Sequence, residues 1–183
     1  FPVTGEPIIK LTAEATVMPI ENYTAKIIER IQNPFGVNLQ LTQVNITLKK
    51  GWNLISIPVK PLNNTVEAIF GQLDFYSIWT WNPTAKMYEK PTVIEPGKGY
   101  WILVENDTSI IISGLLIEET EVPLKTGWNL IGSIYAPNTA YMGDVQTFYG
   151  KVYIWNAEKR MYEIVDSIPI GMGAWILAYT DTY

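Results

Sequence analysis

The sequence predicts a mainly β protein made of two duplicated small β domains, each with a short helix, plus an N-terminal strand and short helix. Two observations support this prediction. Blocks of residues recur in the same order about 75 positions apart. Between them lie short β-branched and aromatic runs bounded by Gly, Pro and Asn. We expect the extension over residues 1–36, the first unit over 37–113 and the second over 114–183.

The internal repeat consists of four collinear blocks. Residues 48–55 return at 124–131 with an offset of 76, and the other three blocks return with an offset of 74. Those three are 81–82 with 155–156, 87–89 with 161–163, and 97–103 with 171–177. The change of offset places a two-residue deletion in a loop near Pro61 and Pro137. Four blocks in one order indicate that the second unit duplicates the first.

Each unit is expected to consist of strands joined by tight turns. Residues 64–67 have the spacing of a helix-capping box, and Gly71 ends the short helix that follows. Asn82 and Pro83 form a turn between two strands, which predicts a hairpin. The expected strands are residues 37–48, 53–59, 76–81, 87–89, 100–104 and 109–117.

The N-terminal extension has no counterpart in either unit. Apolar and polar residues alternate there over nine positions, which is typical of a half-buried strand. The apolar members of this strand are Ile9, Leu11, Ala13, Ala15 and Val17. Residues 24–32 then place three isoleucines on one face of an expected helix, which Pro34 ends.

The extension offers a spare strand, and the second unit is expected to lack one. In the first unit the chain continues into the strand at 109–117, whereas the second unit stops at Tyr183 without such a continuation. We therefore expect an open sheet edge, which folded proteins normally cover. The N-terminal strand fills that edge within one molecule or, by β-strand addition, in a neighbouring subunit.

Composition excludes several classes of function. The net charge of −5 and the pI of about 4.8 argue against nucleic acid as a partner. The chain has no Cys and no His, which removes thiolate metal sites and the usual general base. No apolar stretch reaches the roughly 18 residues that a membrane span needs. We expect no catalytic residues, no metal and no cofactor.

Two features favour an exported protein. The chain begins Phe1-Pro2-Val3 without an initiator Met, which indicates either a trimmed chain or removal of a leader peptide. It also carries four Asn-x-Ser/Thr acceptor sequences for glycans. These are Asn22, Asn45, Asn63 and Asn106. We expect an extracellular or cell-surface glycoprotein.

The repeated blocks resemble a known family. Gly-Trp-Asn-Leu-Ile, a Trp-Asn hairpin and Gly-Lys-Gly-Tyr-Trp-Ile together are similar to a repeat common in secreted and surface proteins of archaea and bacteria. The resemblance covers residues 48–183 and implies an extracellular setting without an established chemistry. The second copy departs from it with Met172 and Ala174 in place of Lys98 and Tyr100. The chain length and spare strand also resemble, more loosely, subunits of archaeal filaments assembled by donor strands.

The aromatic residues have two interpretations. Six tryptophans recur in both units at strand positions, which favours packing in the core over stacking on a glycan. They are Trp52, Trp81, Trp101, Trp128, Trp155 and Trp175. Trp79 and Tyr100 are the better carbohydrate-binding candidates, because the second unit does not repeat them: Tyr153 stands at the position of Trp79 and Ala174 at that of Tyr100.

The charged and glycine motifs favour structural roles. Glu89 and Glu163 recur in separate domains and do not face one cleft, as a pair of hydrolytic carboxylates would. The acidic run of Glu118, Glu119 and Glu121 lacks the spacing of a calcium loop. The Gly-x-Gly of residues 97–99 precedes a strand rather than a helix, so it is no phosphate loop.

These patterns predict a non-enzymatic structural protein of the cell surface. The main hypothesis is a subunit of a filament or pilus-like polymer, assembled by addition of the strand containing Ile9 to Val17 to another copy of the chain. The alternative is a carbohydrate-binding or adhesion module whose partners are cell-surface glycans. The position of the first 20 residues and the exposure of the aromatic rings distinguish the two.

Overall fold

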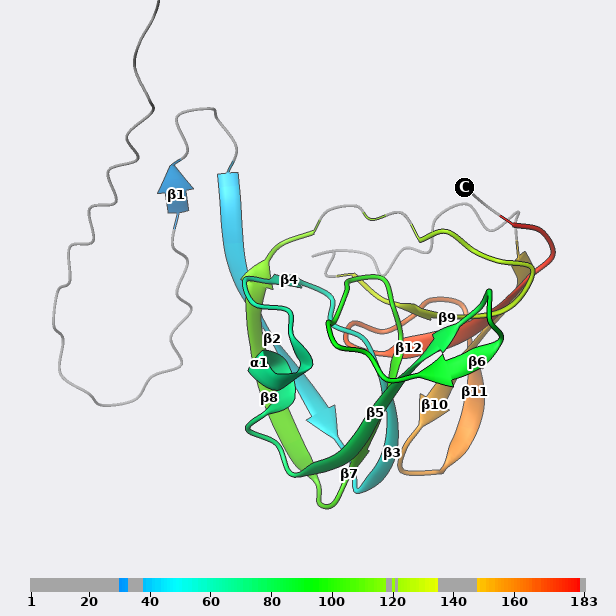
Figure 1. Cartoon of the computed structure of the whole chain (residues 1–183), viewed down its shortest axis with the longest axis horizontal. Helices are drawn as coiled ribbons and strands as arrows, with labels where there is room; N and C mark the ends of the chain where they lie inside the picture. Colours follow the sequence, from blue (N-terminus) through cyan, green and yellow to red (C-terminus); the bar gives the residue numbers. More distant parts are fainter. Residues whose placement is uncertain (1–29, 33–37, 118–119, 121, 135–147, 182–183) are drawn as a thin grey trace, which may run out of the picture.

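The computed structural model describes residues 30–32, 38–117, 120, 122–134 and 148–181. The prediction of a mainly β fold is confirmed, since these residues form three antiparallel sheets of four strands each (Figure 1). The strand Ile9 to Val17, the acceptor Asn22 and the acidic run at 118, 119 and 121 lie outside the described residues.

The first sheet has the order β1-β2-β8-β4. Its strands are β1 (Arg30–Gln32), β2 (Asn38–Leu48), β8 (Thr108–Leu115) and β4 (Lys60–Pro61). The long pair β2 and β8 runs side by side in Figure 1 and is in register from Leu41 opposite Leu115 to Leu48 opposite Thr108. Along β2, apolar side chains that point inward alternate with polar side chains that point outward, as expected of a sheet with one face exposed to solvent.

The second and third sheets have the same strand order. The second is β3-β7-β5-β6, and the third is β9-β12-β10-β11. The strands of the second sheet are β3 (Gly51–Ile55), β7 (Tyr100–Val104), β5 (Phe75–Asn82) and β6 (Met87–Glu89). Those of the third are β9 (Gly127–Gly132), β12 (Gly173–Ala178), β10 (Phe148–Asn156) and β11 (Met161–Val165). Equivalent positions of the sequence repeat thus occupy equivalent strands, as expected of duplicate units.

One helix, α1 (Val66–Phe70), is present among the described residues. The hydroxyl oxygen of Thr65 accepts a hydrogen bond from the amide of Ala68, and the helix ends at Gly71. The end at Gly71 agrees with the sequence prediction, whereas the N-cap lies at Thr65, one residue after the start of the predicted capping box at Asn64. The cap satisfies an amide that the first turn leaves without a partner. The corresponding helix of the second unit would fall within residues 135–147, outside the described part.

Three expectations need correction, and pairing with distant strands explains each. Residues 30–32 belong to β1, which pairs with β2, so the helix expected over 24–32 does not extend through them. The strand expected over 53–59 ends at Ile55, because the next amide, of Ser56, donates to the Gly171 carbonyl in the other unit. A short helix or strand is hardly stable by itself, so pairing with a distant strand determines which secondary structure these residues adopt.

The third correction concerns the open edge expected in the second unit. Strand β8 pairs with β2 and β4 and is no part of the sheet of the first unit. The second and third sheets therefore each consist of four equivalent strands, and the third sheet is complete without an equivalent of β8.

The hydrophobic core has three parts. One lies between the first and second sheets and includes Leu48, Ile57, Phe70 and Ile102. A smaller one belongs to the third sheet and includes Val152, Ile154 and Ile176. The third part joins the units through Leu54, Leu130 and Trp175, and it carries the aromatic residues described below.

Candidate functional site

The junction between the units is reciprocal: a contact made by one unit is repeated by the other with the roles exchanged. The Ser56 amide donates to the Gly171 carbonyl at 2.9 Å, and the Gly132 amide donates to the Gly97 carbonyl at 2.8 Å. Positions 56 and 132 are equivalent in the repeat, as are 97 and 171. Such self-complementary contacts are those of a twofold dimer interface. Here two halves of one chain form it.

The Gly-x-Gly motif of the repeat serves this junction. A Cβ atom at Gly99 would lie 2.7 Å from the Ile131 carbonyl oxygen, and one at Gly173 would lie 2.7 Å from the Ile55 carbonyl oxygen. The second glycine of each motif therefore lets the backbone of the other unit approach. The motif is structural, as the sequence indicated, but it acts between the units rather than within one turn.

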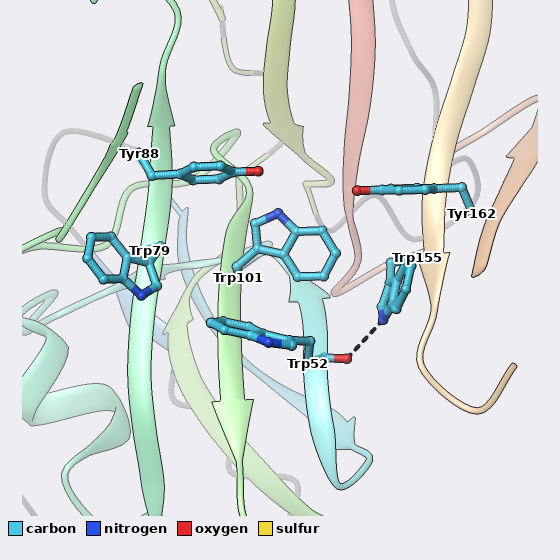
Figure 2. A pocket seen from close by; sticks show the side chains of 6 residues that line it. All are labelled: Trp52, Trp79, Tyr88, Trp101, Trp155 and Tyr162. Carbon is cyan, nitrogen blue, oxygen red and sulfur yellow. Dashed lines mark hydrogen bonds between the residues drawn. The ribbon is translucent and has the colours of Figure 1, made fainter. Parts of the chain in front are cut away.

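Two tryptophans, one from each unit, donate hydrogen bonds across the junction. The indole N–H of Trp81 donates to the Trp128 carbonyl at 2.8 Å. The indole N–H of Trp155 donates to the Trp52 carbonyl at 2.9 Å, which is the dashed line in Figure 2. Each donor stands at the end of a hairpin strand, β5 or β10, and reaches the first strand of the other unit, β9 or β3. Packing and hydrogen bonding thus hold the rings in place.

The rings surround two clefts. Cleft 1, of about 480 Å³, is shown in Figure 2. It is lined by Trp52, Trp79, Tyr88, Trp101, Trp155 and Tyr162. Cleft 2, of about 530 Å³, is lined by Trp81, Tyr88, Trp128, Tyr153, Tyr162 and Trp175. Exchanging each residue of cleft 1 for its repeat equivalent gives the lining of cleft 2, with Tyr153 in the place of Trp79.

The expectation that the six repeated tryptophans pack in the core is wrong for Trp52 and Trp128, whereas Trp81, Trp101 and Trp155 pack against the core cluster that contains Trp175. Only Trp175 is buried, whereas Trp52 is 41% exposed and Trp128 is 45% exposed. Trp81, Trp101 and Trp155 are half-buried. A sequence pattern shows that these strands are apolar, but the half-exposed rings result from the docking of the second sheet against the third.

Edge-to-face ring contacts fix the walls of both clefts. The Trp81 and Trp175 ring centroids are 5.5 Å apart with an interplanar angle of 72°, and those of Trp101 and Trp155 are 5.5 Å apart at 70°. Each pair joins one unit to the other. Aromatic pairs prefer this geometry, which holds the rings rigidly while leaving ring faces directed into the clefts.

Tyr88 and Tyr162 line both clefts. Figure 2 shows their hydroxyl groups pointing toward one another beside Trp101. Burial raises the pKa of Tyr88, while the nearby Trp101 indole lowers it. Burial raises the pKa of Tyr162 as well, and the charge of an ionised Tyr88 raises it further. Both phenols are therefore neutral near pH 7 and can donate and accept hydrogen bonds.

The clefts are otherwise almost without polar groups. No charged side chain lines either of them among the described residues. The amine of Lys90 lies 5.2 Å from the centroid of the Trp79 ring, so one cation stands beside cleft 1 as a cation–π partner. The indole nitrogen of Trp101 is buried without an ordinary hydrogen-bond partner in the described structure. This lining suits ligands with apolar ring faces and hydroxyl groups.

The structure separates the two carbohydrate-binding candidates. Trp79 lines cleft 1, whereas Tyr100 is only 1% exposed and cannot stack on a ligand. The Tyr100 ring points into the core from β7, where its hydroxyl oxygen accepts a 2.8 Å hydrogen bond from the Glu95 amide. Burial raises the pKa of Tyr100 to about 12. The alternation of Tyr100, Ile102 and Val104 on one face was the sequence signal for this burial.

The remaining sequence candidates lie elsewhere on the surface. Asn45, Asn63 and Asn106 are exposed and available as glycan acceptors. The carboxylates of Glu89 and Glu163 each accept a hydrogen bond from the Asn of their own hairpin, at positions 82 and 156. They support the hairpin turns that place the tyrosines.

Sequence analysis did not identify Tyr88 and Tyr162 as site residues. Their signal was present in the repeated Met-Tyr-Glu block, where an aromatic residue recurs on a strand just after a hairpin turn. The tyrosines of this block matter because the hairpins of both units fold toward the same junction.

Within the described residues, no helix is long and apolar enough to span a membrane, and no group of acidic side chains is placed to hold a metal ion. The chain matches no protein-family model, no curated protein and no solved structure.

Proposed function

We propose that this protein is a non-enzymatic carbohydrate-binding or adhesion module of the cell surface, and that it holds uncharged glycans in the two aromatic clefts. The observation that carries the proposal is the lining of each cleft by six Trp and Tyr rings, drawn from both units and partly exposed. Soluble proteins seldom expose so much aromatic surface in one place without a ligand for it.

The chemistry of the lining favours a sugar. The face of an aromatic ring carries partial negative charge and attracts the weakly positive C–H groups on the face of a sugar ring. The phenol groups of Tyr88 and Tyr162 add hydrogen-bonding groups for sugar hydroxyls. Because no charged side chain among the described residues lines the clefts, the lining favours an uncharged ligand. Cleft volumes of about 480 and 530 Å³ fit short stretches of a glycan chain.

Binding to insoluble polysaccharides tests this proposal. We expect cellulose or chitin to deplete the protein from solution, and soluble fragments of the bound polymer to quench its tryptophan fluorescence. The double variant Trp52→Ala and Trp128→Ala should lose this binding, because it removes the two most exposed tryptophan faces of the clefts and leaves the main-chain acceptors of Trp155 and Trp81 in place. Tyr76→Ala is the matched control, since Tyr76 is exposed and lines neither cleft.

Two results would overturn the proposal. One is unchanged polysaccharide binding in the double variant. The other is the absence of binding to any polysaccharide, together with binding of a proline-rich peptide. Extended proline helices also dock in aromatic grooves, so such peptides are the competing ligand class.

We also propose, as a second candidate, assembly into a surface filament by β-strand addition. The observation that favours it is the outer edge of β8. Among the described residues, β4 covers that edge only opposite Leu115 and Gly114. The stretch from Thr108 to Ser113 could therefore accept a strand on that side, and the segment Ile9 to Val17 of another copy has the required alternation.

Truncation tests the second candidate. Deleting residues 1–20 should leave folded monomers that no longer polymerise, as measured by circular dichroism and light scattering. A truncated protein that still forms filaments, or one that unfolds because the segment belongs to its own fold, would exclude strand addition between subunits. Neither result bears on the aromatic clefts.

A further inference from the structure

We infer that one extended, uncharged glycan chain of β-1,4-linked sugars lies across both clefts at once, and that it binds in either direction. The inference rests on the proposed function and specifies its ligand. It follows from two features of the structure: the clefts share residues, and they are equivalent by exchange of the two units.

The shared residues make the clefts adjoin. Tyr88 and Tyr162 line both, so a ligand that leaves one cleft at this pair enters the other. Both tyrosines are 46% exposed, and their hydroxyl groups point toward one another (Figure 2). The pair thus forms the boundary over which a chain passes, with hydroxyl groups there to bond it.

The equivalence of the clefts determines how a directional chain is recognised. A polysaccharide has a reducing and a non-reducing end, but reversing it only exchanges which end lies in which cleft. Since cleft 2 repeats cleft 1 with Tyr153 for Trp79, both orientations meet nearly the same rings. Stacking on ring faces depends little on chain direction, whereas recognition by fixed hydrogen bonds would depend on it strongly.

The rings that line each cleft favour a glycan with β-1,4 linkages. The β-1,4 linkage of equatorial sugars gives an extended ribbon in which successive rings are turned over, so that both faces present C–H groups. The rings of Trp52 and Trp155 in cleft 1, and of Trp128 and Trp81 in cleft 2, come from different units and line the same cleft. An extended ribbon with two apolar faces can contact the rings of both units, and its lack of charge matches the uncharged lining.

Both units are required for either cleft. Cleft 1 takes Trp52, Trp79, Tyr88 and Trp101 from the first unit, and Trp155 and Tyr162 from the second. Cleft 2 reverses these contributions. Duplication therefore does more than double a site, because it creates both clefts at the junction and makes them adjoin at Tyr88 and Tyr162.

Calorimetry with two series of oligosaccharides, cello-oligosaccharides and chito-oligosaccharides, tests the inference. In the series that binds, the disaccharide should occupy two equivalent sites per protein molecule, and the hexasaccharide should bind at one per molecule. The affinity for the hexasaccharide should exceed that for the disaccharide by about 100-fold or more, because its second contact is intramolecular. Trp128→Ala should reduce hexasaccharide affinity to the level of the disaccharide and leave one disaccharide site, with Tyr76→Ala as the unchanged control.

A spin label on the reducing end of the hexasaccharide tests the direction. We expect it to broaden the indole NMR signals of both Trp52 and Trp128, because the two orientations are both populated. Broadening at only one of them would overturn direction-independent binding. Binding of two hexasaccharides per molecule with no gain in affinity would overturn the spanning chain but leave the proposed function intact. Absence of binding in both series would overturn this inference, whereas the proposed function fails only if no polysaccharide binds.

Discussion

The indole N–H of Trp155 donates a 2.9 Å hydrogen bond to the main-chain carbonyl of Trp52, and so joins the hairpin of the second unit to the first strand of the first unit. The same bond joins Trp81 to Trp128 in the opposite sense at 2.8 Å. The repeated tryptophan of the hairpin thus forms one hydrogen bond across the junction in each unit. The clefts depend on it, because Trp52, Trp128 and Trp155 are among their walls.

Replacing either donor by phenylalanine should weaken the junction. Trp155→Phe and Trp81→Phe keep an aromatic ring and remove one hydrogen bond each, which we expect to lower the free energy of unfolding by about 1 kcal/mol. Urea unfolding measures this difference. Trp79→Phe is the matched control, since its indole makes no hydrogen bond across the described junction; an equal loss in all three variants would show that ring size rather than the bond matters.

Adding a methyl group at the close approach of the two backbones should be more damaging. In Gly99→Ala and Gly173→Ala the new Cβ would lie 2.7 Å from a carbonyl oxygen of the other unit. We expect each variant to lose about 1–3 kcal/mol of stability, because the backbones must move apart. Thermal unfolding gives the loss, and tryptophan fluorescence reports the clefts. Thr84→Ala, at an exposed turn, should change neither; wild-type stability in both glycine variants would contradict the described junction.

Asp181 should contribute stability that acid removes. Its carboxylate accepts hydrogen bonds from the Thr126 amide at 2.7 Å and from the Lys125 amine, and these lower its pKa from 3.8 to about 2. A carboxyl group with a depressed pKa stabilises the fold above its unfolded pKa and loses that contribution as the pH falls through the folded value.

The corresponding experiment compares wild type with Asp181→Asn in urea at several pH values. The difference in their free energies of unfolding should be constant above about pH 5 and shrink between about pH 4 and pH 2. Asp107 occupies the equivalent place, where the Lys50 amide lowers the pKa of its carboxyl group, and Asp107→Asn should follow the same trend. A pH-independent difference would mean that the hydrogen-bonded charge is unimportant.

Glycan attachment provides a test of export. Asn45, Asn63 and Asn106 are exposed, so we expect mass spectrometry of protein from its native source to find a glycan on at least one of them. Asn82 is the internal control, because Pro83 after it prevents modification although Thr84 follows. Three unmodified acceptors would count against passage through a glycosylating pathway.

Local chemistry made much of the fold readable from the sequence. The capping residue Thr65 and the terminating Gly71 specify α1, because each acts on the backbone beside it. The Asn82 side chain accepts hydrogen bonds from the Thr84 and Ala85 amides, which makes the predicted hairpin turn. Elements that depend on distant partners were less predictable: β1 took residues expected in a helix because β2 pairs with it.

The sequence by itself determined that this protein is mainly β, that its second unit duplicates the first, and which residues are equivalent, because repeats and strand patterns are local properties of the chain. Only the tertiary structure decided what the equivalent aromatic residues do. Tyr100 lies in the core, whereas Trp52 and Trp128 line the clefts, although all three lie on apolar strands. The reason is physical: the alternation of a strand assigns a side chain to a face, but whether that face meets a core or solvent depends on how two sheets dock. Here the second glycine of each Gly-x-Gly motif lets the second and third sheets dock, and the aromatic clefts form at that junction.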